Sequence, residues 1–302
     1  MSTFFFKGSV FNNDFQYSDS ELWVSDGTAL GTQQLTEFRF PTGSLPAYAG
    51  LDPRELTLVN NTLFFVGDNR AGFDGLQIWK SDGTAAGTVE VTSLQAGFGV
   101  TGIGMDPADL VDVNGVLYFI GITTANGGSQ QLWKSDGTSA GTVQVTSSTD
   151  GLKNILGNIP LVDVGGTLFF NAQGTADNTV QLWKWSSSSG AVQLTNGTSP
   201  FDAQNPLVVN GTLYFTAENS AGAAQLWKSD GSAAGTVQIT NIANGITGLT
   251  HVGNQLYYMN STDHHVWVSD GTAAGSVQLP IAADANTTIL GAAGSYLYGY
   301  EA

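Results

Sequence analysis

The sequence contains no cysteine, only nine lysine and arginine residues, and no long apolar segment. Without cysteine the chain has no disulfide bond, no thiolate nucleophile and no zinc–thiolate site. The formal net charge of -16 repels nucleic-acid phosphates and anionic lipid surfaces. No run of about 18 apolar residues is present. We therefore expect no nucleic-acid partner and no membrane insertion.

The residues that are abundant are typical of β-structure. The chain has 39 glycines, 41% hydrophobic residues and 11% charged residues. Short β-prone runs alternate with Gly, Asn, Asp and Ser, which favour turns, and no segment has a convincing helical pattern. The sequence therefore predicts an all-β protein. The N-terminal segment lacks a basic region followed by an apolar stretch, so we expect no cleavable signal peptide.

One phrase of eight residues is repeated along the chain. It reads Glu-Leu-Trp-Val-Ser-Asp-Gly-Thr at residues 21–28, and the copy at 181–188 has lost the Asp-Gly-Thr end. The six copies contain Trp23, Trp79, Trp133, Trp183, Trp227 and Trp267. Repetition with a period of about fifty residues predicts one supersecondary unit stacked several times, because each unit exposes an apolar face that a neighbour must cover. We therefore predict a single domain over residues 1–302.

Each repeat predicts a four-stranded antiparallel sheet. In the third repeat, Leu110–Val113 and Val116–Phe119 flank the turn Asn114–Gly115, and strands at Trp133 and Val143–Thr146 follow. Asn-Gly between two apolar runs is a strong hairpin signal, because both turn residues adopt positive φ.

The second and third strands of a repeat carry large apolar residues in succession, as in Leu63–Val66 and Gln77–Lys80. Such strands are covered on both faces. Sheets stacked face to face around an axis provide this cover, whereas a two-sheet sandwich shows cleaner alternation. We therefore predict a six-bladed β-propeller with four-stranded antiparallel blades.

The two ends of the chain indicate how such a ring closes. Thr3–Phe6 is typical of a second strand without a first, and Ile289–Ala293 with Tyr296–Tyr300 is typical of a first hairpin without a third strand. Joining the N- and C-terminal strands would complete one blade. Because Thr3–Phe6 and Tyr296–Tyr300 claim the same slot, either one of them lies at an edge or the ends are exchanged between molecules.

The near-identical turns are expected at one rim of the propeller, and the variable segments at the other. Function more often resides in variable loops on a rigid scaffold. The candidate binding residues in these loops are Phe11, Phe15, Tyr17, Asp68, Arg70, Phe73 and Asp74.

The repeated residues allow a functional and a structural interpretation. The tryptophans are either sugar-stacking platforms or large residues packed between blades, and their apolar neighbours favour packing. The repeated aspartates are Asp26, Asp82, Asp136, Asp230 and Asp270. A calcium ion needs about six to eight oxygens and each copy supplies one carboxylate, so we interpret these aspartates as turn residues and predict no metal and no cofactor. The lysines that follow tryptophan are expected at a solvated edge.

No catalytic set of residues can be assembled with specificity. His264 and His265 are adjacent, so in a strand they point to opposite faces and do not easily share a metal ion. Asp112 and Asp163 are candidate acids for glycoside hydrolysis at the inner rim, although lining a hydrated channel is the simpler role for them.

The phrase at Glu21–Thr28 resembles the bacterial ELWxxDGT repeat, which is found in large secreted or surface proteins. Other copies replace the glutamate by glutamine or histidine. The resemblance covers essentially the whole chain. It implies an extracellular or cell-surface location and no particular reaction.

These observations favour a non-catalytic, lectin-like binding module that recognises a glycan or protein at the bacterial surface through its rim loops. Two alternatives stay open, namely an architectural repeat without a small-molecule ligand and a propeller glycoside hydrolase. Exchange of terminal strands would make the protein an oligomer.

Overall fold

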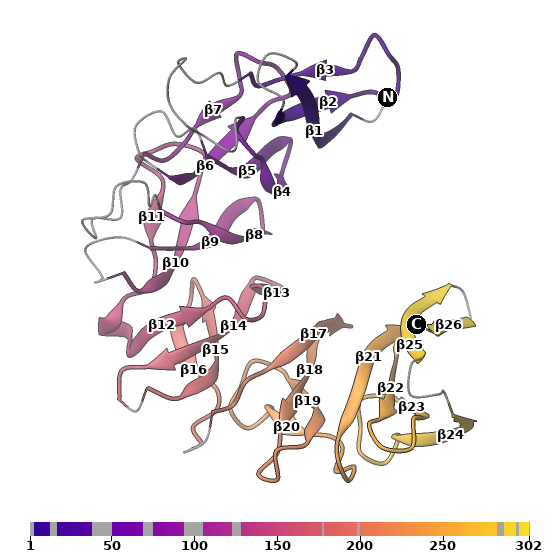
Figure 1. Cartoon of the computed structure of the whole chain (residues 1–302). Coiled ribbons are helices and arrows are strands. Elements are labelled where there is room, and N and C mark those ends of the chain that lie inside the picture. The colour runs from indigo at the N-terminus through magenta and orange to yellow at the C-terminus, as the bar shows by residue number, and fades with distance from the viewer. Residues whose placement is uncertain are drawn as a thin grey trace. The chain divides into compact units, whose positions relative to one another are not determined.

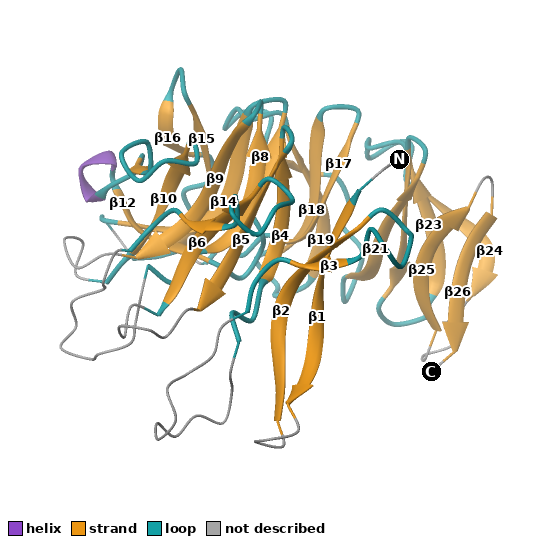
Figure 2. Ribbon diagram, turned by 90° about the horizontal axis from the view of Figure 1, so that it is seen from above, coloured by secondary structure: helices purple, strands orange, loops and turns teal. Residues whose placement is uncertain are grey.

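The computed structural model describes residues 3–12, 17–37, 50–68, 75–93, 105–122, 128–176, 178–197, 200–282, 287–293 and 296–301. Contacts along the chain define two compact units, Met1–Asp150 and Gly151–Ala302, and each is described by itself. Both consist of antiparallel sheets (Figure 1). The helical element among the described residues is a short 3-10 turn at Ser148–Asp150 (Figure 2). The predicted all-β class is confirmed.

The first unit contains three sheets, which we name A, B and C. Sheet A consists of β1 (Phe4–Asn12), β2 (Tyr17–Ser25) and β3 (Gln33–Gln34). Sheet B consists of β4 (Arg54–Val59), β5 (Thr62–Asp68), β6 (Leu76–Ser81) and β7 (Val89–Glu90). Sheet C consists of β8 (Ala108–Val113), β9 (Val116–Ile122), β10 (Gln130–Ser135) and β11 (Val143–Gln144). Strands pair in chain order, so sheets B and C are the expected four-stranded meanders, and sheet A has three strands among the described residues.

The second unit contains sheets D, E, F and G. Sheet D consists of β12 (Leu152–Leu156), β13 (Val162–Val164), β14 (Thr167–Gly174), β15 (Val180–Ser186) and β16 (Gly190–Gln193). Sheet E consists of β17 (Gln204–Val209), β18 (Thr212–Glu218), β19 (Ala224–Ser229) and β20 (Val237–Gln238). Sheet F consists of β21 (Ile246–Val252), β22 (Gln255–Asn260), β23 (His265–Ser269) and β24 (Val277–Ala282). Sheet G is the hairpin β25 (Thr287–Ala293) and β26 (Tyr296–Glu301).

Successive sheets within each unit cover one another's faces. Strands β5, β9 and β14 each bury five residues in succession, as expected for strands packed on both sides. Phe64 and Ile78 of sheet B belong to one buried cluster with Phe119 and Trp133 of sheet C. Burial of apolar surface between neighbouring sheets therefore holds each unit together.

The first hairpins of sheets C and E close as the sequence predicts. Asn114 and Gly115 have φ values of 52° and 83°, and Asn210 and Gly211 have 51° and 71°. These positive values match a two-residue hairpin turn, in which Asn and Gly are favoured. The same turns also touch between sheets, because the Asn60 side chain donates a hydrogen bond to the Gly115 carbonyl at 3.2 Å.

The first strand of most sheets contains a bulge, which the sequence pattern does not predict. In β4, β8, β17 and β21 the register shifts between two paired residues. The residue that follows the first of them has positive φ in all four strands, namely Glu55, Asp109, Asn205 and Gly248. In sheet D the irregularity is larger and splits the first strand into β12 and β13, both paired with β14. Sheet D therefore has five strands instead of the expected four.

Candidate functional site

The repeated turn is closed by its own side chains. In sheet B, Asp82 Oδ1 accepts hydrogen bonds from the backbone N–H and the hydroxyl of Thr84 at 2.9 and 2.7 Å. Ser81 Oγ accepts the N–H of Gly83 at 3.1 Å, and Thr84 Oγ1 accepts the N–H of Gly87 at 2.9 Å. The Thr84 hydroxyl, followed by its N–H, lowers the pKa of Asp82 because both stabilise the carboxylate. Each group of this turn therefore has a local partner.

The same bonds occur in the other complete copies of the phrase. The aspartates with this pattern are Asp26, Asp82, Asp136, Asp230 and Asp270. Their pKa values are all lowered, first by the side-chain hydroxyl two residues on. A turn that satisfies its carboxylate in this way needs no ion for closure.

The repeated turn also contacts the preceding sheet. Lys80 Nζ of sheet B donates to the carbonyl of Gly137 in the turn of sheet C at 2.8 Å. A Cβ atom at Gly137 would lie 3.1 Å from the ring of Phe64, which is tighter than ordinary packing. Gly137 also has a φ of 87°, which favours glycine. We call this combination of lysine, aromatic ring and turn glycine the turn contact.

The turn contact recurs in the second unit. Lys228 of sheet E donates to the carbonyl of Gly271 in sheet F at 3.1 Å, and the hydroxyl of Tyr214 lies against Gly271. Between sheets D and E, a Cβ at Gly231 would lie 3.4 Å from the ring of Phe169. The lysines after tryptophan are half-buried, so the expectation that they lie at a solvated edge is wrong. The ammonium groups of Lys80 and Lys228 reach the next sheet.

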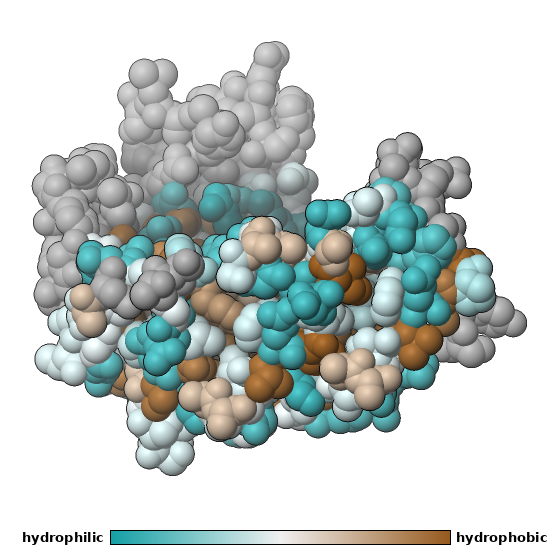
Figure 3. Space-filling model, turned by 90° about the horizontal axis from the view of Figure 1, so that it is seen from below, coloured by the Kyte–Doolittle hydropathy of each residue, from teal (hydrophilic) through white to brown (hydrophobic). Residues whose placement is uncertain are grey.

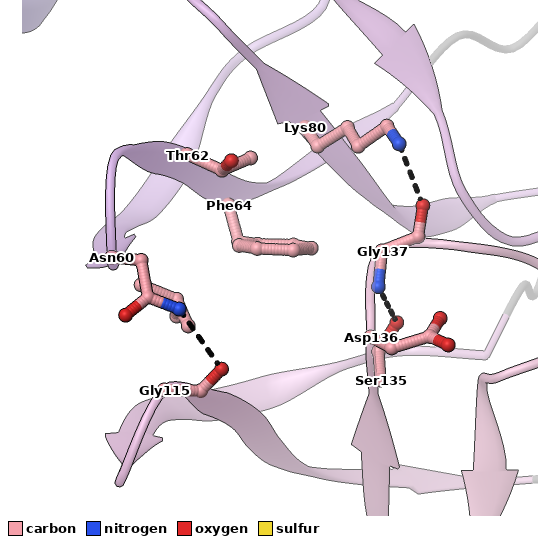
Figure 4. A pocket seen from close by; sticks show the side chains of 9 residues that line it. Asn60, Thr62, Phe64, Lys80, Gly115, Ser135, Asp136 and Gly137 are labelled. Atoms are coloured by element: carbon pink, nitrogen blue, oxygen red, sulfur yellow. Dashed lines mark hydrogen bonds between the residues drawn. The ribbon is translucent and has the colours of Figure 1, made fainter.

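A small cleft lies at the turn contact between sheets B and C (Figure 4). Its volume is about 120 Å³, and Asn60, Phe64, Lys80 and Asp136 are among the side chains that line it. Both turn types meet there, which confirms for these two sheets that the Asn-Gly and Ser-Asp-Gly turns lie at the same end. At the corresponding place between sheets E and F, the ring is Tyr214 instead of phenylalanine.

The repeated tryptophans lie in the third strands, opposite aromatic residues of the second strands. Phe65 stacks on Trp79 with ring centroids 6.3 Å apart, and Phe119 stacks on Trp133 at 6.4 Å. Trp79, Trp133 and Trp183 are buried, whereas Trp23, Trp227 and Trp267 are half-buried. Small residues make room for the indoles, since a Cβ at Gly67 would lie 3.0 Å from Trp79. Three of the six indoles are therefore buried within the packed sheets, and the other three are partly covered.

The end of the sheets with the first-strand bulges carries a different set of side chains. In the first unit, Lys7 of β1 and Arg54 of β4 both form ion pairs with Asp52. Burial raises the pKa of Asp52, but the hydrogen bonds from Lys7 and Arg54 outweigh it and leave the pKa lowered. We name Lys7, Asp52, Arg54, Glu55 and Asp109 the bulge cluster.

Glu55 and Asp109 are the two bulge residues of this cluster. Glu55 Oε2 accepts the backbone N–H of Leu110 at 3.1 Å, so sheet B contacts sheet C here. Asp109 lies beside Leu110, and one of its carboxyl oxygens is fully buried. Burial, and secondly the negative charge of Glu55, raise the pKa of Asp109 to about 6.

The second unit keeps an acid, Asp202, at the position of Asp52, but has neutral residues at the positions of Lys7, Arg54 and Glu55. Asn171, which occupies the register position of Lys7, donates to Asp202 at 2.9 Å. Asn158 also donates to Asp202. The bulge residue Asn205 donates to the Thr216 hydroxyl at 3.1 Å. The bulge end therefore varies between sheets in charge and in bonding pattern, whereas the turn bonds are the same in the five sheets that keep the complete phrase.

The candidate binding residues fall mostly outside what the structure describes. Asp68 is the last residue of β5 and is half-buried. Phe11 and Tyr17 lie in the paired strands β1 and β2, but their side chains are outside the described part. Phe15, Arg70, Phe73 and Asp74 lie outside the described residues. The grouping of these seven side chains therefore stays a prediction.

The bulge cluster was missed because bulges at Glu55 and Asp109 are not marked by glycine. One signal was present in the sequence. Asp52-Pro53 and Asp106-Pro107 stand at equivalent distances before the two bulge residues. A repeated Asp-Pro indicates a fixed chain direction at the start of the first strand, and this repeat could have drawn attention to the acidic residue that follows.

Other candidate residues have structural partners. Asp112 and Asp163 each accept the N–H of a turn glycine, Gly115 and Gly166, at 2.8 Å. His265 Nδ1 lies 3.3 Å from Asp263 Oδ1. Within the described ranges no group of three or more His, Asp or Glu side chains could hold a metal ion. The described part of the chain also holds no helix of the length and hydrophobicity needed to cross a membrane.

Comparison with known proteins identifies the fold. No protein-family model matches the sequence, and no curated protein matches it either. Puromycin hydrolase has a similar structure, with a TM-score of 0.52 and 12% sequence identity over 98% of this chain and 48% of that chain. The β-propeller domain of the Trilobed protease from Pyrococcus furiosus matches with a TM-score of 0.49 and 13% identity, over 91% of this chain and 77% of that one. The likeness to puromycin hydrolase shows a shared fold, and the repeated antiparallel sheets are those expected of a β-propeller.

Proposed function

We propose that the chain is a non-catalytic β-propeller binding module that holds its partner at the bulge end of its sheets. The observation that carries this proposal is the difference between the two ends. The turn end uses its repeated side chains to close turns and to contact the next sheet. The bulge residues change from sheet to sheet, from the acids Glu55 and Asp109 in the first unit to the neutral Asn205 in the second. Variation on a regular scaffold is typical of recognition surfaces.

The chemistry of the described residues favours a protein partner with a basic segment over a glycan. The repeated tryptophans are buried or half-buried, which disfavours indole platforms for sugars. In the bulge cluster, Lys7 and Arg54 are already paired with Asp52, which leaves the acids Glu55 and Asp109 facing one another. The net charge of -16 adds a field that attracts basic partners.

The adjoining loops complete the proposed surface. Its candidate contact residues are Phe11, Phe15, Tyr17, Asp68, Arg70, Phe73 and Asp74. Aromatic side chains in this set would also suit a glycan, so a lectin-like ligand is the second candidate. Membership of the ELWxxDGT family and an extracellular or cell-surface location are part of the same proposal.

The test uses the fluorescently labelled chain on two arrays, one of glycans and one of extended basic, neutral and acidic peptides. We expect basic peptides to bind, with affinity that falls as salt is raised. The Glu55→Gln/Asp109→Asn double variant should lose this binding. The Asp82→Asn/Asp136→Asn variant removes the same number of acids at the turn end and should keep it. Selective binding to glycans would show that the ligand is a glycan and not a basic protein segment. No binding on either array would contradict the proposal.

We further propose that sheets A to F are six blades of one ring closed by terminal strands. Sheet A lacks the first strand among the described residues, and sheet G supplies a first hairpin with the bulge typical of a first strand. Closure within one molecule gives a monomer in light scattering. Exchange of terminal strands gives a dimer or larger assembly.

A further inference from the structure

The contact between β4 and β8 depends on side chains, because the bulge in β8 interrupts the regular pairing. The register with β9 shifts between Ala108 and Val111, so Asp109 and Leu110 have no register partners there. Backbone groups released by a bulge need other hydrogen-bond partners when they are shielded from water.

Sheet B supplies these partners to Leu110. Glu55 Oε2 accepts the N–H of Leu110 at 3.1 Å. The hydroxyl of Thr57 donates to the carbonyl of Leu110 at 3.2 Å. Two side chains of β4 therefore take the place of a neighbouring strand, and one of them is ionisable.

Asp109 places a second carboxyl group at this contact. Its φ of 56° is in the left-handed region, which is sparsely populated by residues other than glycine. Its Oδ2 is fully buried and has no hydrogen-bond partner among the described residues. A protonated carboxyl group tolerates such a place better than an ionised one, because a buried charge without a partner is costly.

Among the charged groups on the strands around β8, Glu55 is the one whose charge raises the pKa of Asp109. Arg54, also on β4, is paired with Asp52. Asp112, on β8 itself, accepts the N–H of Gly115. Asp68, the last residue of β5, lies at the same end of sheet B as Glu55, but the charge that raises the pKa of Asp109 is that of Glu55. Strand β9 contains no charged residue.

We propose that Glu55 and Asp109 form a pH-sensitive contact between sheets B and C, which is tight in mild acid and loosened at neutral pH. Below the transition Asp109 carries a proton, so Glu55 can accept the Leu110 N–H without facing a second negative charge. Above it both groups are ionised and repel each other. Burial and the Glu55 charge, which raise the pKa of Asp109 to about 6, place the transition in a physiological range.

The experiment is amide hydrogen exchange, followed by NMR on the whole chain and expressed as protection factors corrected for the intrinsic rate. Protection of the Leu110 N–H should fall roughly threefold or more between about pH 5 and about pH 7.5. In Asp109→Asn the protection should stay high across this range. In Glu55→Gln, which keeps an acceptor oxygen and loses the charge, the midpoint should move to lower pH.

Asp112→Asn is the matched control, because it removes a carboxylate from the same strand and should keep the transition. Equal protection of Leu110 at both pH values in the unmodified chain would overturn the proposal, as would an unchanged transition in Asp109→Asn. If Asp109→Asn does not fold, the midpoint in Glu55→Gln decides. An unchanged midpoint there contradicts the role of the pair.

Discussion

The two ends of the same sheets differ in how their polar side chains are used. At the turn end, Asp82, Lys80 and their counterparts bond to their own turn or to the next sheet. At the bulge end, Glu55 and Asp109 are acids with little compensation, whereas Asn205 at the equivalent place is neutral. This difference indicates that a residue repeated along this chain makes a structural contact. Departure from repetition indicates where a specific function can reside.

Exposed hydrophobic side chains are scattered over the described surface. On the face shown in Figure 3, hydrophobic side chains lie as separate spots among hydrophilic ones. Five outer strands each expose one valine, namely Val89, Val143, Val192, Val237 and Val277. Single exposed apolar residues of this kind are ordinary on protein surfaces and need no partner.

The largest expected effect comes from removing a repeated indole. Trp79→Ala should lower the free energy of unfolding by about 3–5 kcal/mol, because Trp79 is 6% exposed and packs on Phe65. Urea unfolding followed by circular dichroism measures it. Val89→Ala, at an exposed outer strand, is the control and should cost less than about 0.5 kcal/mol. A cost for Trp79→Ala as small as the control would mean that the indole is a surface platform.

A smaller effect is expected from filling the space beside the indole. Gly67→Ala should cost about 1–3 kcal/mol, because its Cβ would lie 2.8 Å from Leu51 and 3.0 Å from Trp79. Ala217 in sheet E already occupies the equivalent register position and serves as a comparison. Thermal unfolding of both Gly67→Ala and Ala217→Gly tests the point. A stabilised Gly67→Ala protein would show that the sheet has room there.

Breaking one turn contact should have a modest effect. Lys80→Met keeps the aliphatic stem and removes the hydrogen bond to the Gly137 carbonyl, at a cost of about 1 kcal/mol. Lys153→Met, at an exposed lysine of β12, should cost close to nothing. Urea midpoints of the two variants give the comparison directly. Equal urea midpoints would show that the hydrogen bond of the turn contact does not contribute to stability.

The smallest effect is a decline of stability with rising pH. The pKa of Asp109 is raised from 3.8 to about 6, so the folded chain holds a proton that the unfolded chain has released. Stability should therefore fall between about pH 4 and pH 6, by about 1 kcal/mol after allowance for partial exposure. The lowered pKa values of Asp52 and the turn aspartates act oppositely and remove stability as the pH falls below about 4. Unfolding midpoints across this range, with Asp109→Asn as the comparison, separate the two contributions.

The sequence predicted the sheets and their turns well because both depend on local patterns. Asn114–Gly115 required positive φ, and apolar residues in succession required cover on both faces. The reach of Lys80 to Gly137 could not be predicted, because it depends on how one sheet lies on the next. Split pairing in sheet D was missed for a related reason, since no local pattern fixes where a first strand is interrupted.

The candidate site was predicted less well than the fold. Loop length and aromatic content directed attention to residues such as Phe15 and Phe73, which lie outside the described residues. The acids at the first-strand bulges became visible only through their backbone conformation and their contact across sheets. Neither property has a strong signature in a single sequence, apart from the repeated Asp-Pro.

Amide hydrogen exchange at the repeated turns tests most directly whether the repeated eight-residue phrase has a structural role. We expect slow exchange for the N–H groups of four turn glycines, because each bonds to the preceding serine hydroxyl. These glycines are Gly83, Gly137, Gly231 and Gly271. The turn of sheet D around Ser188, which has lost the phrase, should exchange much faster. If the four glycines exchange as fast as Ser188, these N–H groups are not held by the serine hydroxyls, and the structural role of the phrase is contradicted.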